Sequence, residues 1–299
     1  IAFVVVAGSL GARLAYWQVV RADELSAMAV KQSSMRYEIP SERGSIYDRT
    51  GTVVLATSVS RDLLAANPKL LEPPRRAEVA GKLVELLRLE GEPAEKLTAR
   101  MTSDKEYVVL ARDLDPAISD RIRAMLAGKK PELSGLILEP QQVRLYPQAG
   151  GGPNTTLAAH LLGFVNREGA GQYGVEQYYQ DDLAGMKGVV AAQRDASGNA
   201  VPDTSSVLEE GYPGQNLTLT IDASLQVAVE QELLSAWIAD RAKRVSAVVM
   251  DPYTGEIVAY ASYPSFDAND YQAIAAEDPG VFVDPIVSTV YEPGSVFKM

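Results

Sequence analysis

The stretch YEPGSVFKM, residues 291–299, decides how the rest of the chain is interpreted, because it places a serine and a lysine three residues apart after a chain break. Pro293 and Gly294 interrupt regular structure, and Ser295 then begins a predicted helix. Residues three apart share one helix face, so the side chains of Ser295 and Lys298 point the same way. A serine beside a deprotonated lysine is a nucleophile with its own base, and backbone N–H groups at the helix start can stabilise an oxyanion.

A structural interpretation of the same residues is that Ser295 is a helix N-cap and Lys298 a solvated lysine of the first turn. An isolated S-x-x-K match is expected by chance about once in a chain of this length. The pattern therefore gains meaning only from the rest of the sequence.

Composition excludes several classes of function. The chain has 299 residues, enough for two domains, and its net charge of −11 argues against a nucleic-acid partner. It has no cysteine, which excludes disulfides and thiolate metal sites. His160 is the one histidine, and we interpret it as a hydrogen-bonded structural residue rather than a base. Neither a metal nor an organic cofactor is expected.

The N-terminus carries a membrane signal. Residues 1–12 are uncharged and almost wholly apolar, and Arg13, Tyr16 and Trp17 follow. Twelve helical residues span only about 18 Å of a hydrocarbon core of about 30 Å. We interpret residues 1–20 as the end of a transmembrane helix, with Arg13 reaching towards water and the aromatic side chains at the interface. A clipped signal-peptide core and a buried soluble helix are the alternatives.

From Met35 onwards the pattern alternates between strand and helix, which predicts an α+β module. Predicted strands are residues 36–40, 52–56 and 105–111, and predicted helices are 75–89 and 116–126. Asp48 and Gly51 frame the turn of a hairpin. Arg43, Asp48 and Arg49 around this turn could form a catalytic charge cluster, but a structural salt-bridge network is the preferred interpretation.

The second half contains a Gly/Pro loop at 148–154, a polar connection at 202–211 and a predicted domain boundary near 211–214. A strand at 216–221 then precedes a helix that runs from an Asp222 or Ser224 cap to Arg241. Its predicted apolar stripe comprises Leu225, Val229, Leu233 and Trp237. Strands 246–250 and 256–262 form a hairpin with Gly255 in the left-handed conformation, and the Val/Ala-rich first strand predicts burial on both faces.

These motifs, in this order, resemble the class B penicillin-binding proteins, the bitopic transpeptidases of bacterial cell-wall synthesis. The similarity covers nearly the whole chain. The motifs are R-G-x-I-x-D-R-x-G (43–51), R-x-Y-P (144–147), H-L-L-G (160–163), G-V-E (174–176) with Tyr179, L-T-I-D (219–222) with Leu225-Gln226, D-P-x-T-G-E-I (251–257), Y-P-S-F-D (263–267) and E-P-G-S-x-F-K (292–298).

The resemblance implies an α+β chain with a membrane-anchor stub at 1–20, a non-catalytic pedestal (dimerisation-type) domain at 21–213 and the start of an α/β transpeptidase domain at 214–299. It implies that Ser295 attacks the penultimate D-Ala of a peptidoglycan stem peptide with Lys298 as general base, and that β-lactams acylate the same serine. The expected location is the bacterial cell membrane, single-pass, with the main domains outside the cytoplasm. The expected partners are a membrane glycan polymerase and other division or elongation proteins.

One departure from the family pattern affects the expected activity. The family also needs an S-x-N and a K-T-G element, and only Met299 follows Lys298. We therefore expect a truncated chain that is inactive by itself. The alternatives are a non-catalytic membrane-tethered scaffold or β-lactam sensor on the same fold, and an acyl-serine β-lactamase. Tyr291-Glu-Pro-Gly-Ser and Ala66-Asn-Pro-Lys69 favour the division type over the elongation type.

Overall fold

The computed structural model describes residues 2–22, 34–39, 41–127, 133, 135–193, 206–290 and 292. They form two compact units. Unit 1 comprises Ile1–Glu42 and Ala184–Gly214, and unit 2 comprises Arg43–Leu183 and Gln215–Met299. Both units are thus assembled from two separate segments of the chain.

Unit 1 begins with α1 (Ala2–Ala15), which continues into a π-helical turn, Tyr16–Val20. The guanidinium of Arg21 lies over the Trp17 ring, 4.8 Å from its centroid. Among the residues with described structure, no helix combines the length and apolar character needed to cross a membrane.

The sheet of unit 1 has three antiparallel strands in the order β1-β8-β9. They are β1 (Ser34–Ile39), β8 (Gly188–Gln193) and β9 (Ser206–Glu209). The predicted strand at 36–40 is therefore present, but its expected place in the hairpin around Asp48 was wrong. The two-residue strand β2 (Ile46–Tyr47) lies directly beside the turn, and it takes that place instead.

The sheet of unit 2 is built around β3 (Val54–Ala66), whose 13 residues extend for about 40 Å. Its neighbours are β2, β4 (Val108–Leu114) and β5 (Leu136–Leu145), all antiparallel to it, and β10 (Leu217–Thr218) pairs with β2 in parallel. The predicted strand at 52–56 ends ten residues too early, and β5 was not predicted. The pairs of β3 and β5 extend from Thr57↔Leu145 to Ala66↔Leu136.

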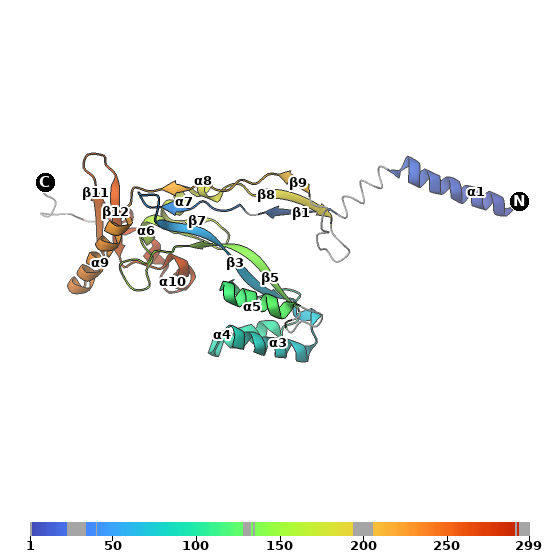
Figure 1. Ribbon diagram of the computed structural model, residues 1–299, viewed down its shortest axis with the longest axis horizontal. Coiled ribbons are helices and arrows are strands. Elements are labelled where there is room, and N and C mark those ends of the chain that lie inside the picture. Colours follow the sequence, from blue (N-terminus) through green and yellow to red (C-terminus); the bar gives the residue numbers. More distant parts are fainter. Residues whose placement is uncertain are drawn as a thin grey trace. The chain divides into compact units, whose positions relative to one another are not determined.

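Three helices pack at one end of β3 and β5 (Figure 1). They are α3 (Pro73–Leu86), α4 (Gly91–Met101) and α5 (Pro116–Leu126). Their apolar faces enclose a core that includes Leu64, Leu83 and Ile122, none of which is exposed. The sequence predicts α5 correctly, with Asp115 accepting a 2.8 Å hydrogen bond from the Ala117 N–H, whereas α4 was not predicted.

A second core lies towards the other end of the long strands, where short elements meet. It receives residues from α6 (Ala159–Leu162), β6 (Phe164–Val165), α7 (Gly174–Tyr178), α8 (Gln180–Ala184), α10 (Tyr271–Glu277) and the 3₁₀ helices Ala268–Asp270 and Pro279–Phe282. The strand β7 (Gly171–Gln172) pairs with β6, and α11 (Pro285–Ser288) follows the last 3₁₀ helix. Phe164 stacks on Tyr271 with ring centroids 4.6 Å apart, and Phe266 and Phe282 complete the aromatic cluster.

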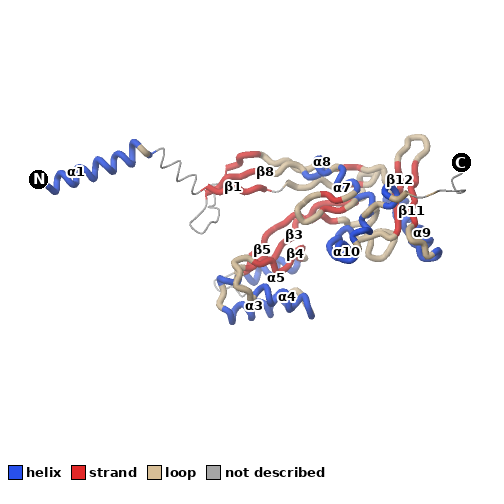
Figure 2. Tube along the Cα trace, turned by 180° about the vertical axis from the view of Figure 1, so that it is seen from behind, coloured by secondary structure: helices blue, strands red, loops and turns tan. Residues whose placement is uncertain are grey.

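The C-terminal part of unit 2 contains α9 (Ala223–Asp240) beside the hairpin of β11 (Val245–Met250) and β12 (Ile257–Tyr263) (Figure 2). The helix, its Asp222 cap and the hairpin with Gly255 at φ +78° agree with the sequence prediction. Two packing predictions were wrong. Leu225 is exposed while Gln226 is buried, and alternate residues of β11, including Met250, are exposed.

Candidate functional site

The two residues of the predicted catalytic pair, Ser295 and Lys298, lie outside the described residues, as does the rest of the motif except Glu292. Their geometry therefore stays a prediction. What the structure does describe is the segment that leads to them, residues 263–290, and the polar contacts that hold that segment.

Two side chains fix the path of this segment near residues 281–284. The His160 Nε2 atom lies 2.9 Å from the Val281 carbonyl oxygen, and the Tyr260 hydroxyl donates to the Asp284 carboxylate at 2.5 Å. His160 comes from α6 and Tyr260 from β12, so two separate elements of unit 2 hold the chain here. Burial, together with the bonded Asp284 carboxylate, raises the pKa of Tyr260 far above its ordinary value, which keeps the phenol protonated.

His160 is a structural residue, as predicted from the sequence. Its Nδ1 atom lies 3.1 Å from the Ser262 hydroxyl, while Nε2 faces a carbonyl oxygen that can only accept. The ring therefore carries its proton on Nε2, and Nδ1 accepts from Ser262. Both side chains are almost wholly buried, and burial lowers the pKa of His160 below its ordinary value of 6.5. This Ser–His pair has no access to a substrate.

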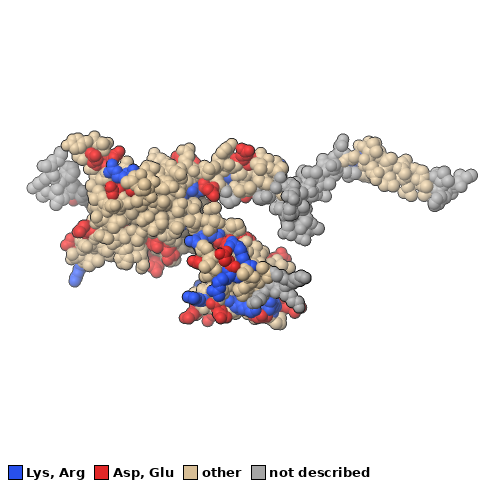
Figure 3. Space-filling view, viewed as in Figure 1, with Lys and Arg blue, Asp and Glu red and all other residues tan. Residues whose placement is uncertain are grey.

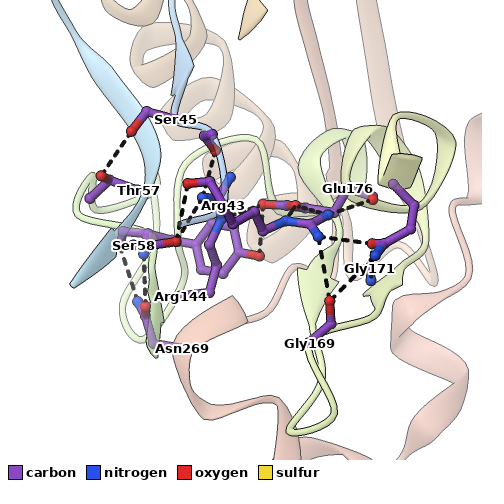
Figure 4. Close-up of polar contacts among 12 residues, drawn as sticks. Arg43, Ser45, Thr57, Ser58, Arg144, Gly169, Gly171, Glu176 and Asn269 are labelled. Atoms are coloured by element: carbon purple, nitrogen blue, oxygen red, sulfur yellow. Dashed lines mark hydrogen bonds and ion pairs between the residues drawn. The ribbon is translucent and has the colours of Figure 1, made fainter. Parts of the chain in front are cut away.

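A buried ion cluster joins three of the motifs, R-G-x-I-x-D-R-x-G at 43–51, R-x-Y-P at 144–147 and G-V-E at 174–176 (Figure 4). The Glu176 carboxylate is fully buried, and it accepts from Arg43 Nη2 at 2.7 Å and from Arg144 Nε at 2.7 Å. The two arginine side chains are only 8% and 4% exposed. Each guanidinium also donates to a backbone carbonyl oxygen, that of Glu176 for Arg43 and that of Gly44 for Arg144. The charged groups are therefore hydrogen-bonded to the backbone as well as paired with each other.

Tyr146 connects this cluster to the segment that leads to the predicted site. Its hydroxyl donates to Glu176 Oε1 at 3.3 Å, and its backbone N–H and C=O form bonds of 2.9 and 3.0 Å with the Asn269 side-chain amide. Burial, reinforced by the Glu176 charge, raises the pKa of Tyr146 well above its ordinary value, so the phenol remains a donor.

The predicted network of Arg43, Asp48 and Arg49 was wrong, because the three residues have separate partners. Asp48 is buried in the turn, where it accepts from the Thr50 hydroxyl at 2.7 Å. Its pKa is lowered because hydrogen bonds from the turn outweigh burial. Arg49 forms an exposed 3.7 Å pair with Glu256. Sequence proximity was misleading here, since Arg43 points away from the turn towards Glu176.

A second buried carboxylate, Glu230 on α9, was not predicted from the sequence. It accepts from the backbone N–H of Gly151 at 2.7 Å, from that of Ala158 at 2.8 Å and from the Gln226 amide at 2.8 Å. Burial raises its pKa despite these bonds. A Cβ on Gly151 would lie 2.5 Å from Glu230, so the glycine loop at 148–154 is shaped to fit the helix.

The one signal in the sequence that could have revealed this site is the i, i+4 spacing of Gln226 and Glu230, which places both side chains on one helix face. Neither residue belongs to a metal site, because the described part of the chain contains no group of three or more His, Asp or Glu side chains that could hold an ion.

Comparison with known proteins identifies the class first through two family matches. Residues 38–219 match the family model of the penicillin-binding protein dimerisation domain, and residues 245–299 match that of the penicillin-binding protein transpeptidase domain. The first match spans more than half of the chain. The chain therefore belongs to the penicillin-binding proteins with a dimerisation domain, which confirms the resemblance drawn from its motifs.

Curated relatives carry related names. The chain is 32% identical to stage V sporulation protein D of Bacillus subtilis, over 96% of its own length and 42% of that protein. It is also 32% identical to peptidoglycan D,D-transpeptidase FtsI of Escherichia coli, over 96% of its length and 46% of the relative. The chain thus spans less than half the length of these relatives.

Solved structures share the fold. Penicillin-binding protein 2X from Streptococcus thermophilus matches with a TM-score of 0.57 at 22% identity, over 84% of this chain and 38% of that chain. A peptidoglycan synthetase from Bifidobacterium adolescentis matches with a TM-score of 0.51 at 28% identity, over 80% of this chain and 46% of that chain. The fold of most of the chain is therefore one that is known from penicillin-binding protein structures.

Proposed function

We propose that the intact protein is a peptidoglycan D,D-transpeptidase that cross-links stem peptides through an acyl-serine intermediate. The observation that carries this proposal is the match of residues 245–299 to the transpeptidase family, because that range contains the S-x-x-K motif in its expected setting. The name of the Escherichia coli relative supports the same activity.

In the proposed reaction, Ser295 attacks the carbonyl carbon of the penultimate D-Ala, and Lys298 takes the hydroxyl proton. Lys298 passes this proton to the nitrogen of the terminal D-Ala, the bond to that residue breaks, the residue leaves as an amine, and an ester to Ser295 remains. An amine from a neighbouring stem peptide then attacks the ester, forms the cross-link and frees the serine. β-Lactams would acylate Ser295 in the same way but leave it blocked.

The proposed organisation is a membrane-anchoring helix over 1–20, a pedestal over 21–213 and the start of the transpeptidase domain over 214–299. The apolar α1, with Tyr16, Trp17 and Arg21 at its end, supports a single-pass anchor whose aromatic residues lie at the membrane interface. The proposed partners are a membrane glycan polymerase and other division or elongation proteins. A related solved structure, 26% identical over 94% of this chain, is described as a peptidoglycan synthase complex in which polymerisation and crosslinking are coordinated.

Labelling with a fluorescent penicillin tests the nucleophile. In the full-length protein Ser295→Ala is expected to abolish covalent labelling, because no other serine replaces the acylated oxygen. Ser288→Ala is the matched control, since Ser288 is an exposed serine at the end of α11 in the same region, and it should label normally. Stoichiometric labelling of Ser295→Ala would assign the nucleophile elsewhere. A wild-type protein that folds but does not label would favour a non-catalytic scaffold.

The 299-residue chain alone is expected not to acylate at the rate of the full-length enzyme. In this chain only Met299 follows Lys298, so it does not contain the S-x-N and K-T-G elements that come after S-x-x-K in the family. Those elements would support the lysine and complete the oxyanion site. A burst of acylation by this chain at the full-length rate would contradict the proposal that acylation needs the S-x-N and K-T-G elements.

A further inference from the structure

The strand β4 has one free edge. Within the described residues its only strand partner is β3, with pairs from Asp62↔Leu114 to Ala66↔Val108, while β5 pairs with β3 along the opposite side. The last turn of α4 lies close to the open edge, where Arg100 Nη1 donates to the Val109 carbonyl at 3.1 Å. This contact uses one carbonyl of the edge, and a strand edge whose other backbone groups have no strand partner can accept a further strand.

The surface beside this edge contains a hollow of about 580 Å³ whose charged lining residues are all basic, namely Arg100, Lys105, Arg112 and Arg167. All four are exposed, and in the described part of the chain none forms a salt bridge. This local positive charge contrasts with the net charge of −11 on the whole chain. Figure 3 shows that most Lys and Arg atoms visible on its face lie over the part that carries α3, α4 and α5, where Asp and Glu atoms lie among them.

Two acidic residues near β4 in sequence pair outside the first hollow, whereas Asp113 and Asp115 line the adjoining hollow together with Lys96. Asp104 pairs with Arg76, and Glu106 pairs with Lys69 at 3.0 Å. Glu139 accepts a 3.0 Å hydrogen bond from the Tyr107 hydroxyl, so its carboxylate contacts a residue of the hollow without pairing with a cation. Among the described residues, the four cations therefore lack anionic partners of their own.

A second hollow of about 430 Å³ adjoins the first and shares Arg100 and Arg112 with it. It lies between α4 and β4, and much of its lining is apolar, including Leu87, Leu97 and Leu110. A strand alternates its side chains between two faces, so an added strand could direct acidic residues to the cations and apolar residues to this second hollow.

We propose that the open edge of β4 docks an extended segment of a partner protein, with acidic and apolar residues in alternation. Such a segment would add as a strand along residues 108–112. The pairing of β4 with β3 shifts register between Val109 and Ala111 and again between Ala111 and Leu114, where Asp113 has φ +51°, and these irregularities limit the added strand to a few residues. Backbone hydrogen bonds supply the general affinity in this mode of recognition, and the cations select the charge.

The test measures binding of designed peptides to the 299-residue chain in detergent micelles by fluorescence anisotropy. The probe is an acetylated Glu-Val repeat, a Lys-Val repeat of the same length reverses its charge, and a third peptide carries proline in place of the central valine. The acidic peptide should bind more tightly than the basic one and less tightly at raised salt. The proline peptide should lose binding, because proline removes a backbone donor.

The double variant Lys105→Glu/Arg112→Glu should reduce the binding affinity for the acidic peptide at least about tenfold. Arg121→Glu on α5 is the matched control, because Arg121 is an exposed arginine outside both hollows, and it should change binding by less than about twofold. Both variants lie on exposed positions, and unchanged circular dichroism checks that they fold. Hydrogen exchange of residues 108–112 should slow when the acidic peptide binds.

Three results would overturn the proposal. The acidic peptide could fail to bind the wild-type chain, or the Lys-Val peptide could bind equally well. The proline peptide or inorganic polyphosphate could also bind as tightly as the Glu-Val repeat without protecting residues 108–112, which would make the hollow a general anion surface and not a site for strand addition.

Discussion

Removing the charge of Glu176 should destabilise the protein far more than removing the charge of an exposed carboxylate. The side chain is not exposed at all, and it accepts from Arg43 at 2.7 and 2.8 Å, from Arg144 at 2.7 Å and from Tyr146 at 3.3 Å. In Glu176→Gln one amide N–H₂ must face a guanidinium, so two buried cations lose their shared anion. Breaking a buried ion pair in this way costs about 3–5 kcal/mol.

The measurement is the midpoint and slope of urea unfolding, followed by circular dichroism. Glu256→Gln is the matched control, because its pair with Arg49 is 3.7 Å long and both side chains are more than 40% exposed. It should cost about 0.5 kcal/mol or less. A cost below about 1 kcal/mol for Glu176→Gln, close to that of the control, would refute the reasoning.

A double-mutant cycle separates the ion pair from simple loss of packing. Arg43→Gln combined with Glu176→Gln should cost clearly less than the sum of the two single changes, by about 1–3 kcal/mol, because the double variant removes an anion together with one of its cations. Additive costs would mean that the two charges contribute independently, which the 2.7 Å contact does not allow.

Two further outcomes follow from the same unit. Gly44→Ala should lower the unfolding midpoint, because a Cβ there would lie 1.9 Å from the Gln215 carbonyl oxygen. Gly81→Ala, in open space on α3, should raise the free energy of unfolding by about 0.5–1 kcal/mol. Equal changes in stability for the two variants would contradict the clash at Gly44. His160 should titrate below pH 6.5, because burial lowers its pKa. Its contribution to stability is then complete above pH 6.5 and is lost as pH falls towards the folded-state pKa. As the only histidine, it gives one NMR signal, and a midpoint above 6.5 would contradict its burial.

Elements with strong local signals could be predicted from the sequence. The helix α5 has an Asp115 cap, a proline at its first position and apolar residues at helical spacing, and all three signals agree. The strand β5 could not be predicted in the same way. Its sequence, LILEPQQVRL, contains Pro140 and no sustained alternation, and it is a strand because ten of its residues pair with β3.

The buried face of α9 shows a different limit. Apolar periodicity placed Leu225 on the buried side, but Gln226 and Glu230 lie there instead. Their polar atoms are satisfied by the backbone of Gly151, Ala158 and Tyr260, which are distant in sequence. Hydrophobic periodicity cannot anticipate a buried polar face, because its partners exist only once the tertiary structure has formed. The predicted pair of Ser295 and Lys298 came from a local motif and stays a prediction.

The contacts of Tyr146 connect parts of the chain that lie more than a hundred residues apart in sequence. Its hydroxyl completes the cluster around Glu176, and its backbone pairs with Asn269 in the segment that leads to the predicted site. Thr156 holds the same segment through the Phe266 carbonyl and the Ala268 N–H, both at 3.0 Å. A residue of the dimerisation-domain match therefore positions the chain on the transpeptidase side through backbone bonds. These hydrogen bonds link the two parts of the chain that match the dimerisation and transpeptidase families.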